Sequence, residues 1–394
     1  MEFSFSKEEK LLQMAVNDFA RKELANKEFD TLDHAPREII EKMGDLGFLG
    51  LKMPEKYGGT SGSWIDIGII TEEIAKQNIS IAYLMMLCYE FSLALARHGN
   101  EEVIEEWLPG LCTGRKLGCI SVTEPGCGSD VAAIRTGAVR DVGFYIISGE
   151  KGPISFGMQA DVAMVFVKTN SEIGPKGITA FLVPVDLPGI TKSSIKSMGV
   201  LPSAPASFKL KEVKVPIKYR IGEEGEGFQI NTSLGFFSDL NRVISGLISL
   251  GLAQTAMTLA TSYAKQRTAF GRPIANFEAV SCKIAEDATF IEASRWLCYR
   301  ALWLKDQGLP NAKEASMCGW WCPKVAFQAI GNALLIHGHA GYSDDLPFQQ
   351  MLRDVTAFEI IAGSEQILKL IIAQSIIGKA AIPDVLSRDI NYYV

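Results

Sequence analysis

A single acidic residue, Glu90, lies in a stretch of sequence that otherwise carries no charge. The residues from Ile81 to Ala96 are apolar or small on nearly every side of a helix, which predicts a buried helix. A carboxylate in such an environment is costly unless it is neutral or paired. Perturbed carboxylates are concentrated at functional sites, so Glu90 is a candidate proton-transfer group. The alternative is a structural glutamate paired with Arg97, two helical turns further on, or with another arginine.

A glycine-rich turn with two hydroxyl side chains follows a predicted strand. Residues 122–131 read VTEPGCGSDV. The proline together with Gly126 and Gly128 favours a turn whose backbone amides face an anionic or carbonyl-rich ring. Thr123 and Ser129 add hydroxyl groups. The segment is a candidate cofactor site, and the alternative is a purely structural β-turn.

Other residues have side chains that bind phosphate or metal ions. Arg267 is a candidate phosphate ligand because a guanidinium pairs bidentately with phosphate, although an arginine that caps a helix C-terminus is the alternative. Cys318 and Cys322 are four residues apart, but no second pair follows at zinc spacing. His337 and His339 have no third ligand in the pattern. We therefore predict no metal site.

The pattern of the chain changes twice, which predicts a mainly α fold with a central β-domain. Residues 1–115 have helical periodicity, and Ser6 with Glu9 forms a predicted capping box. Residues 116–225 have short β-type runs separated by turn residues, as in a small antiparallel barrel or sandwich. Residues 226–394 return to long helical patterns with small residues typical of a helix bundle. The predicted strands are Lys116–Val122, Gly143–Ser148, Val162–Val167, Ile178–Val183 and Ser207–Val215.

Length and composition exclude several classes of protein. The 394 residues, 47% of them hydrophobic, are enough for two or three domains with a large core. The net charge of −6 argues against a nucleic-acid-binding protein with a basic surface. The first residues have no apolar signal core, and the most apolar stretch, residues 79–96, is interrupted by Glu90, so we expect neither secretion nor a membrane span. The eight cysteines form no paired framework, which fits a reducing cytoplasm.

Residues 122–131 resemble the signature of the acyl-CoA dehydrogenases, and other landmarks of that family follow in the expected order. The resemblance extends from Phe5 to about Lys379. It implies an N-terminal helical domain, a middle β-barrel and a C-terminal four-helix bundle. The further segments that carry it are Leu46–Leu51, Pro54–Gly59, Arg267–Gly271, Arg353-Asp354, Gly363-Ser364 and Gln366.

The resemblance implies an FAD enzyme that acts on a CoA thioester. In the family a base removes the proton α to the thioester carbonyl, and the β-hydride passes to flavin N5. The family is usually a homotetramer in which an Arg267-like residue reaches the FAD of a neighbouring subunit, and an electron-transfer flavoprotein is the usual acceptor. The implied substrate contacts are Ser129 and Arg242. The implied FAD contacts are Val122, Thr123, Gly128, Ser129, Ser155, Arg267, Phe270, Ser364 and Gln366.

The sequence departs from the family at the residues that do the chemistry. The usual base is a glutamate just before Gly363, where this chain has Ala362. Some branches place the base just before an arginine on the first long C-terminal helix, where this chain has Asn241. A Trp-Ile-Thr segment against the flavin is replaced by residues 153–155, PIS, and a glutamine near the adenosine is replaced by Leu335.

The absence of both usual bases resembles the branch that dehydrogenates alicyclic thioesters such as cyclohex-1-ene-1-carboxyl-CoA, where an aspartate acts on a more distant ring carbon. We therefore predict that Glu90 is the base of a 1,4-type elimination. Alternatives are a reductase or oxidase that uses the same flavin, and a base-less FAD-binding subunit of a heteromeric dehydrogenase. Asp239, Glu359 and Glu365 are other acids, each more simply explained as solvated or paired with arginine.

Overall fold

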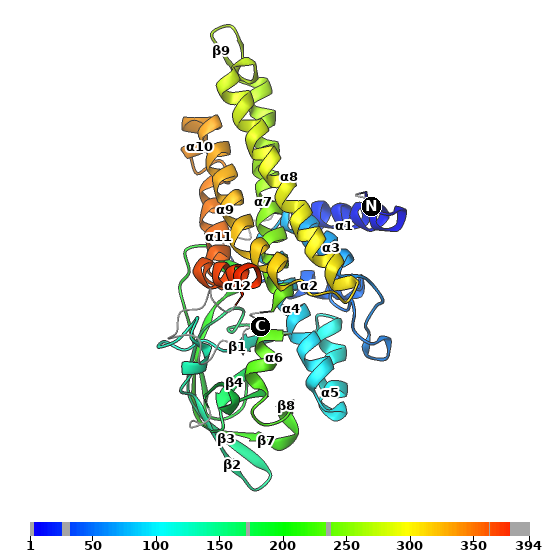
Figure 1. Ribbon diagram of the computed structural model, residues 1–394, viewed down its shortest axis with the longest axis vertical. Helices are drawn as coiled ribbons and strands as arrows, with labels where there is room; N and C mark the ends of the chain where they lie inside the picture. Colours follow the sequence, from blue (N-terminus) through cyan, green and yellow to red (C-terminus); the bar gives the residue numbers. More distant parts are fainter. Residues whose placement is uncertain (1–3, 26–31, 171–173, 234–237, 362, 379–394) are drawn as a thin grey trace.

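The computed structural model describes residues 4–25, 32–170, 174–233, 238–361 and 363–378. A long helical bundle forms one end of the molecule and a β-sheet forms the other, while the N-terminal helices pack beside the point where these two parts meet (Figure 1). The predicted class, mainly helical with a central β-domain, is confirmed.

The N-terminal helices begin with the predicted capping box. The Glu9 amide donates to Ser6 Oγ at 3.1 Å, and the Ser6 amide donates to Glu9 Oε2 at 2.7 Å. Pro36 is the N-cap of the second helix, as its fixed φ angle favours. The helices are α1 (Lys7–Glu23), α2 (Arg37–Asp45), the 3₁₀ turn η2 (Glu55–Tyr57), α3 (Trp64–Ala75), α4 (Ile79–His98) and α5 (Glu101–Cys112).

The middle region is one eight-stranded sheet in which the path runs β6-β7-β3-β2-β4-β5-β8, and β1 pairs with β4. The predicted antiparallel pairing is confirmed for most neighbouring strands. It was wrong for β4, which lies parallel to both β1 and β2. The predicted strands also missed β2, β6 and β8, which are short, and β2 and β6 are largely exposed. The strands are β1 (Gly118–Ser121), β2 (Gly137–Asp141), β3 (Phe144–Ile154), β4 (Val162–Lys168), β5 (Ile178–Pro184), β6 (Ile190–Ser194), β7 (Ala206–Pro216) and β8 (Arg220–Ile221), with 3₁₀ turns η3 (Val131–Ala133), η4 (Gly174–Gly177), η5 (Leu201–Ser203) and η6 (Ile217–Tyr219).

Three long helices of the C-terminal bundle approach one another closely. A Cβ atom at Gly246 would lie 3.1 Å from Cys298 Sγ and 3.2 Å from Cys322 Sγ, so a larger residue there would force these side chains on α8 and α9 to shift. The elements are α6 (Gly227–Ser233), α7 (Asp239–Gln266), the hairpin β9 (Thr268–Ala269) and β10 (Arg272–Pro273), η7 (Ile274–Asn276), α8 (Glu278–Asp306), α9 (Ala312–His337), α10 (His339–Tyr342), α11 (Phe348–Ile361) and α12 (Glu365–Ile377).

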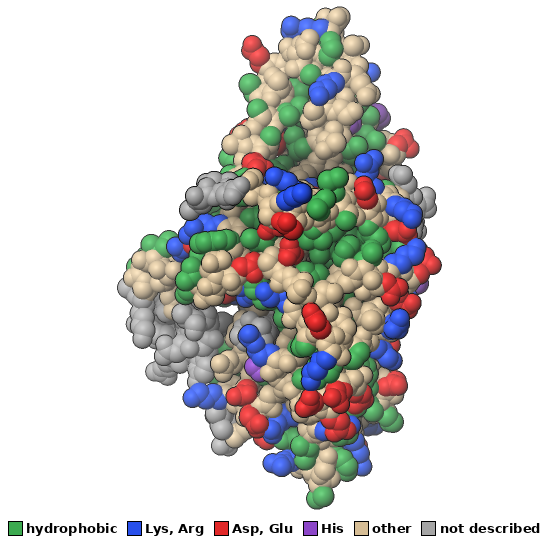
Figure 2. All heavy atoms as spheres, turned by 90° about the vertical axis from the view of Figure 1, so that its right-hand side faces the viewer, with side chains coloured by type: hydrophobic (Ala, Val, Ile, Leu, Met, Phe, Trp, Pro, Cys, Tyr) green, Lys and Arg blue, Asp and Glu red, His purple; other side chains and the backbone are tan. Residues whose placement is uncertain are grey.

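Two helices, α4 and α7, are long and apolar enough to cross a membrane by length and composition alone. In the fold, 89% of the apolar window of α4 and 78% of that of α7 is buried inside the protein. The sequence analysis considered only residues 79–96 for such a span and missed α7. The two helices pack against each other, and the contact between them contains Glu90. Acidic and basic side chains are interspersed over the face that Figure 2 presents.

Candidate active site

A pocket opens between α4, β1, the turn that follows β1 and the end of β3. Four of its six lining residues have apolar side chains, and the other two bear hydroxyl groups. This combination suits a flat aromatic ring with polar edges. The predicted cofactor residues Val122, Thr123 and Ser155 are thus brought to one place. The lining residues are Leu87, Ile120, Val122, Thr123, Pro153 and Ser155.

A buried ion pair anchors the turn that carries Val122 and Thr123. Lys151 on β3 has no exposed surface, and its Nζ donates to Val122 O at 2.8 Å and to Glu124 Oε1 at 2.9 Å. The Glu124 carboxylate also accepts hydrogen bonds from the backbone amides of Arg135 and Thr136. Burial would raise the pKa of Glu124, but the Lys151 ammonium and these hydrogen bonds outweigh it and hold the pKa below the usual range.

The glycines of the turn border open space. Glu124 and Cys127 exchange backbone hydrogen bonds of 3.1 Å, which close the turn. A Cβ atom at Gly126 or Gly128 would meet no chain atom within 4 Å, and Ser129 beside them is exposed. The backbone of the turn is therefore accessible to a group bound in front of it, which fits the predicted use of this segment as a cofactor cradle.

Tyr83, which the sequence did not single out, contacts a residue that lines the pocket. Its buried hydroxyl lies 2.7 Å from Ser155 Oγ, and its ring packs against Phe156 and Phe358 at centroid distances of 5.4 Å and 5.5 Å. Burial raises the pKa of Tyr83 above its usual value, so the phenol stays neutral. The only sequence signal is helical spacing, because Tyr83 is four residues before Leu87 and seven before Glu90.

That spacing links Glu90 to the pocket. Residues three, four and seven apart lie on one face of a helix, so Tyr83, Leu87 and Glu90 share a face of α4. Leu87 lines the pocket, and Glu90 lies about 4.5 Å further along the helix axis. The carboxyl is therefore about one turn beyond the pocket wall.

The Glu90 carboxyl is fully buried, with 0% of the residue exposed. Its Oε2 accepts a 3.0 Å hydrogen bond from Asn241 Nδ2, and its Oε1 has no hydrogen-bond partner among the described residues. Burial raises the pKa of Glu90 well above the usual range, and the hydrogen bonds with Asn241 and Ser238 offset this only in part. The alternative pairing with Arg97 is not formed, because Arg97 is exposed and Glu90 contacts Asn241 instead.

The predicted substrate residue Arg242 lies next to Asn241 but has other contacts. Its Nη1 donates to Asp239 Oδ1 at 2.9 Å and to Ser316 Oγ at 3.4 Å, while its buried Nε has no partner among the described residues. Burial lowers the pKa of Arg242, and Asp239 opposes this shift. Asp239 is therefore paired, as the sequence analysis expected for this alternative acid.

Two predicted FAD residues, Arg267 and Phe270, lie far from the pocket. Both are exposed, and Phe270 has 96% of its surface free at the β9–β10 hairpin, the tip of the bundle in Figure 1. Helix α7 separates Arg267 from Asn241 by about 40 Å. Within one chain these residues do not join Thr123 and Ser155, so their predicted role requires a second copy of the chain.

The predicted C-terminal residues Ser364 and Gln366 are not among the residues that line the pocket. Ser364 is the N-cap of α12, and its Oγ accepts from the Ile367 amide at 3.4 Å. Gln366 is exposed, and Glu365 pairs with Lys324. Ala362, where the usual base would stand, lies outside the described residues.

The histidine and cysteine pairs have structural contacts. His337 Nδ1 lies 2.8 Å from Ala333 O, and its ring stacks on Tyr263 at 4.3 Å. His339 is exposed, and Cys322 Sγ lies 3.6 Å from Cys298 Sγ. Across the described ranges no three His, Cys, Asp or Glu side chains are placed to hold a metal ion.

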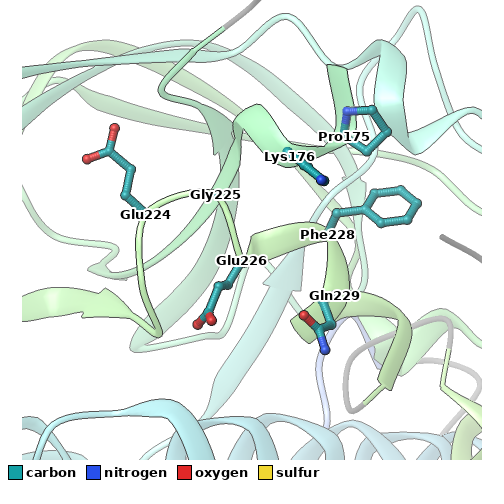
Figure 3. Close-up of a pocket in the computed structure, with 7 residues that line it drawn as sticks. All are labelled: Pro175, Lys176, Glu224, Gly225, Glu226, Phe228 and Gln229. Carbon is teal, nitrogen blue, oxygen red and sulfur yellow. The ribbon is translucent and has the colours of Figure 1, made fainter. Parts of the chain in front are cut away.

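A second pocket lies on the surface between η4 and the turn that leads into α6 (Figure 3). Lys176 and Phe228 lie close together on one side of it, whereas Glu224 lies on the other side. Glu224 accepts a 2.8 Å hydrogen bond from the Tyr145 hydroxyl, and Glu226 accepts one from the Glu223 amide at 2.9 Å. The lining residues are Pro175, Lys176, Glu224, Gly225, Glu226, Phe228 and Gln229.

Comparison with known proteins identifies the family. Three models match consecutive parts of the chain: the N-terminal domain of acyl-CoA dehydrogenases at residues 6–115, the middle domain at 119–213 and the C-terminal domain at 227–377. The chain therefore belongs to the acyl-CoA dehydrogenase family.

Relatives match over nearly the whole chain. A probable acyl-CoA dehydrogenase of Bacillus subtilis is 33% identical over 96% of this chain and 100% of its own length. A caffeyl-CoA reductase–Etf complex subunit of Acetobacterium woodii is 34% identical over 95% and 100%. The solved butyryl-CoA dehydrogenase of Megasphaera elsdenii has a TM-score of 0.91 at 30% identity and covers 96% of this chain and 100% of its own.

The protein is accordingly an FAD-dependent oxidoreductase of the type that acts on CH–CH bonds. The residues beside Thr123 and Ser155 suit the cofactor, because apolar side chains, two hydroxyls and the accessible glycine turn could contact the face and edge of an isoalloxazine ring.

Proposed function

We propose that this protein dehydrogenates an alicyclic CoA thioester of the cyclohexene-carboxyl type, with Glu90 as the base. The observation that carries this proposal is a fully buried carboxyl one helical turn from Leu87 in the pocket wall, with one oxygen that has no partner among the described residues. The two positions that usually provide a base in the family, 241 and 362, hold an asparagine and an alanine. Glu90 is the single acidic residue of α4.

Each part of the site has a separate task in this proposal. FAD, when bound, accepts the hydride that leaves the substrate. The turn with Val122, Thr123, Gly128 and Ser129 would hold the ring together with Ser155. Arg267 and Phe270 would contact the cofactor of a neighbouring subunit, with Ser364 and Gln366 near it.

Proton transfer falls to Glu90. When ionised, its Oε1 accepts a proton as the substrate C–H bond breaks and an O–H bond forms. The site is dry, so the carboxylate is a stronger base than one in water. The 1,4-type elimination is supported by the sequence resemblance to the alicyclic branch; one extra methylene relative to aspartate determines which ring carbon the carboxyl reaches.

The polar end of the CoA thioester is proposed to lie in the pocket of Figure 3. Lys176 offers a cation for phosphate and Phe228 offers a ring face for adenine. A Lys176→Ala variant is expected to raise KM for a CoA thioester but not for the matching pantetheine thioester. An equal rise in KM for both thioesters would show that this pocket does not bind the polar end of CoA.

A second function, reduction of an enoyl thioester on the same site, is favoured by one observation. Because burial raises the pKa of Glu90, it favours the protonated carboxyl, which is the form that can donate a proton. One relative is named as a subunit of a caffeyl-CoA reductase complex. Steady-state rates in both directions, with matched electron acceptors and donors, distinguish the two functions.

The proposed setting is a cytoplasmic homotetramer that passes electrons to an electron-transfer flavoprotein. A name among the relatives includes such a complex, and the distant, exposed Arg267 and Phe270 are explained by a neighbouring subunit. A base-less FAD-binding subunit remains the third candidate, and it predicts no turnover without a partner chain.

Anaerobic titration with a panel of CoA thioesters tests the substrate class. Straight-chain, branched, cyclohexane- and cyclohexene-carboxyl-CoA are added while flavin absorbance is followed. We expect bleaching by the cyclic thioesters alone. Bleaching by a saturated straight chain would mean that a base serves the α carbon and would refute the alicyclic assignment. A bound flavin that no thioester bleaches would favour the reductase or the base-less subunit.

A further inference from the structure

The amide of Asn241 is the side-chain donor that the structure gives to the Glu90 carboxyl. We infer that Asn241 is a positioning residue, which holds Oε2 of Glu90 and leaves Oε1 as the proton-accepting atom, and that Ser245 fixes the orientation of this amide. The inference rests on the proposed function of Glu90 and adds to it two residues with no acidic group of their own.

The start of α7 holds Asn241 in place. Ser238 is the N-cap of α7, and its Oγ accepts from the Asn241 backbone amide at 3.3 Å. Asn241 is therefore the third residue of the helix, where a capping side chain limits fraying. The side chain is fully buried and faces α4.

Ser245, one turn further along α7, determines which end of the amide faces Glu90. Its Oγ donates to Asn241 Oδ1 at 3.3 Å. A hydroxyl donor accounts for the oxygen, so the amide NH₂ is directed at Glu90 Oε2. The second contact of this hydroxyl, Met86 Sδ at 3.5 Å, is a weak acceptor and does not compete. The order Ser245, Asn241, Glu90 thus gives Asn241 Oδ1 and Glu90 Oε2 one donor each. Oε1 has no partner among the described residues, although the Ser238 hydroxyl also favours the ionised carboxylate.

The consequence is chemical rather than only structural. An amide NH₂ stabilises the ionised carboxylate and cannot accept the proton of a neutral carboxyl. A flipped amide would present its oxygen to Glu90 and favour the protonated form. Ser245 opposes this flip and so favours the state that can remove a proton.

Two variants and one matched control test the inference by rapid anaerobic reduction of the bound flavin. Asn241→Leu is expected to lower the rate constant at saturating thioester by about 10- to 100-fold, the range for a hydrogen bond to a charged group. The dissociation constant of the thioester and the flavin spectrum stay unchanged. Ser245→Ala, a milder truncation, is expected to lower the same rate constant by a smaller factor.

Ser249→Ala is the control. Ser249 is a buried hydroxyl one turn beyond Ser245, and it donates to the Ser245 carbonyl without touching Asn241. Its removal is expected to leave the rate constant unchanged. An equal loss in Ser249→Ala and Ser245→Ala would show a general effect on α7 and overturn the inference.

A double-mutant cycle separates this inference from the proposed function. In a Glu90→Gln background, Asn241→Leu is expected to cause no further loss. The same loss in both backgrounds would overturn the positioning role, as would full activity of Asn241→Leu in a protein that Glu90→Gln inactivates. Full activity of Glu90→Gln alone would instead refute the proposed base, and with it the role of Asn241.

Discussion

Two buried glutamates close to the same pocket differ in their partners. Glu124 receives an ammonium from Lys151 and two backbone amides, at distances of 2.7 to 2.9 Å. Glu90 receives one amide NH₂ at 3.0 Å and keeps an oxygen without a partner in the described part of the chain. The pKa of Glu124 is accordingly held below the usual range, whereas burial raises that of Glu90 far above it.

The comparison shows that burial alone does not make a carboxylate reactive. Glu124 is fully engaged and fixes the turn that would hold the cofactor. Burial of the Glu90 carboxyl costs free energy that its hydrogen bonds offset only in part. We expect such a cost to be retained where the carboxyl has a function. We therefore assign structure to the first glutamate and proton transfer to the second.

Replacement of Glu90 has the largest expected effect. Glu90→Gln removes the base while it keeps the shape, and we expect flavin reduction by the reactive thioester to slow by about 10²- to 10⁴-fold with FAD retained. Stopped-flow reduction under anaerobic conditions measures it. Glu359 is a half-buried acid outside the site, and Glu359→Gln is the control that should keep the wild-type rate. An unchanged rate of flavin reduction in Glu90→Gln would show that Glu90 does not transfer the proton.

Breaking the other pair is expected to act on stability. Lys151→Met leaves Glu124 charged and unpaired in a buried position, so the free energy of unfolding should fall by about 3–5 kcal/mol. FAD should also dissociate more readily, because the turn at Val122 loses its anchor. Urea unfolding and FAD retention on gel filtration measure both. Lys211→Met, at an exposed lysine of β7, is the control, and an equal loss there would contradict the account.

The raised pKa of Glu90 predicts that its contribution to stability falls as pH rises. The folded pKa of Glu90 lies above the unfolded value of about 4.3, so its contribution is present below that pH and is lost as pH rises through the folded pKa, by up to about 1.4 kcal/mol per pH unit. Glu90→Gln lacks this loss and should gain stability relative to wild type from pH 5 to pH 8. A difference that stays constant over this range would mean that the pKa of Glu90 is not raised.

Tyr83 gives the smallest effect. Tyr83→Phe removes the hydroxyl that lies 2.7 Å from Ser155 and should cost about 1 kcal/mol of stability. Because Ser155 lines the pocket, the visible absorbance of bound FAD should also shift. Tyr145→Phe, which loses a comparable bond to Glu224, should lower stability without that spectral shift. A spectral shift in both variants, or in neither, would show that the Tyr83 hydroxyl has no specific effect on the cofactor site.

Local signals in the sequence predicted much of this molecule. The capping box at Ser6, the three regions and the burial of Glu90 follow from periodicity and side-chain chemistry over a few residues. The glycine-rich turn was recognised by its motif. Each of these features depends on neighbours within one element.

The missed features join elements that are distant along the chain. Glu90 and Asn241 are 151 residues apart, and Tyr83 and Ser155 are 72 apart. The parallel pairing of β1 with β4 is equally non-local. No periodicity specifies such contacts, so Asn241 was seen only as a missing base, and the alternative pairing of Glu90 with Arg97 is not formed.

The pH dependence of flavin reduction tests the central claim most directly. Wild-type protein is mixed anaerobically with the thioester that bleaches it, and the rate constant is measured from pH 5 to pH 9. We predict that the rate rises with pH through a pKa well above the ordinary carboxyl range, and that this rise is absent from the residual rate of Glu90→Gln. A rise that persists unchanged in Glu90→Gln would show that another group takes the proton and would contradict the account.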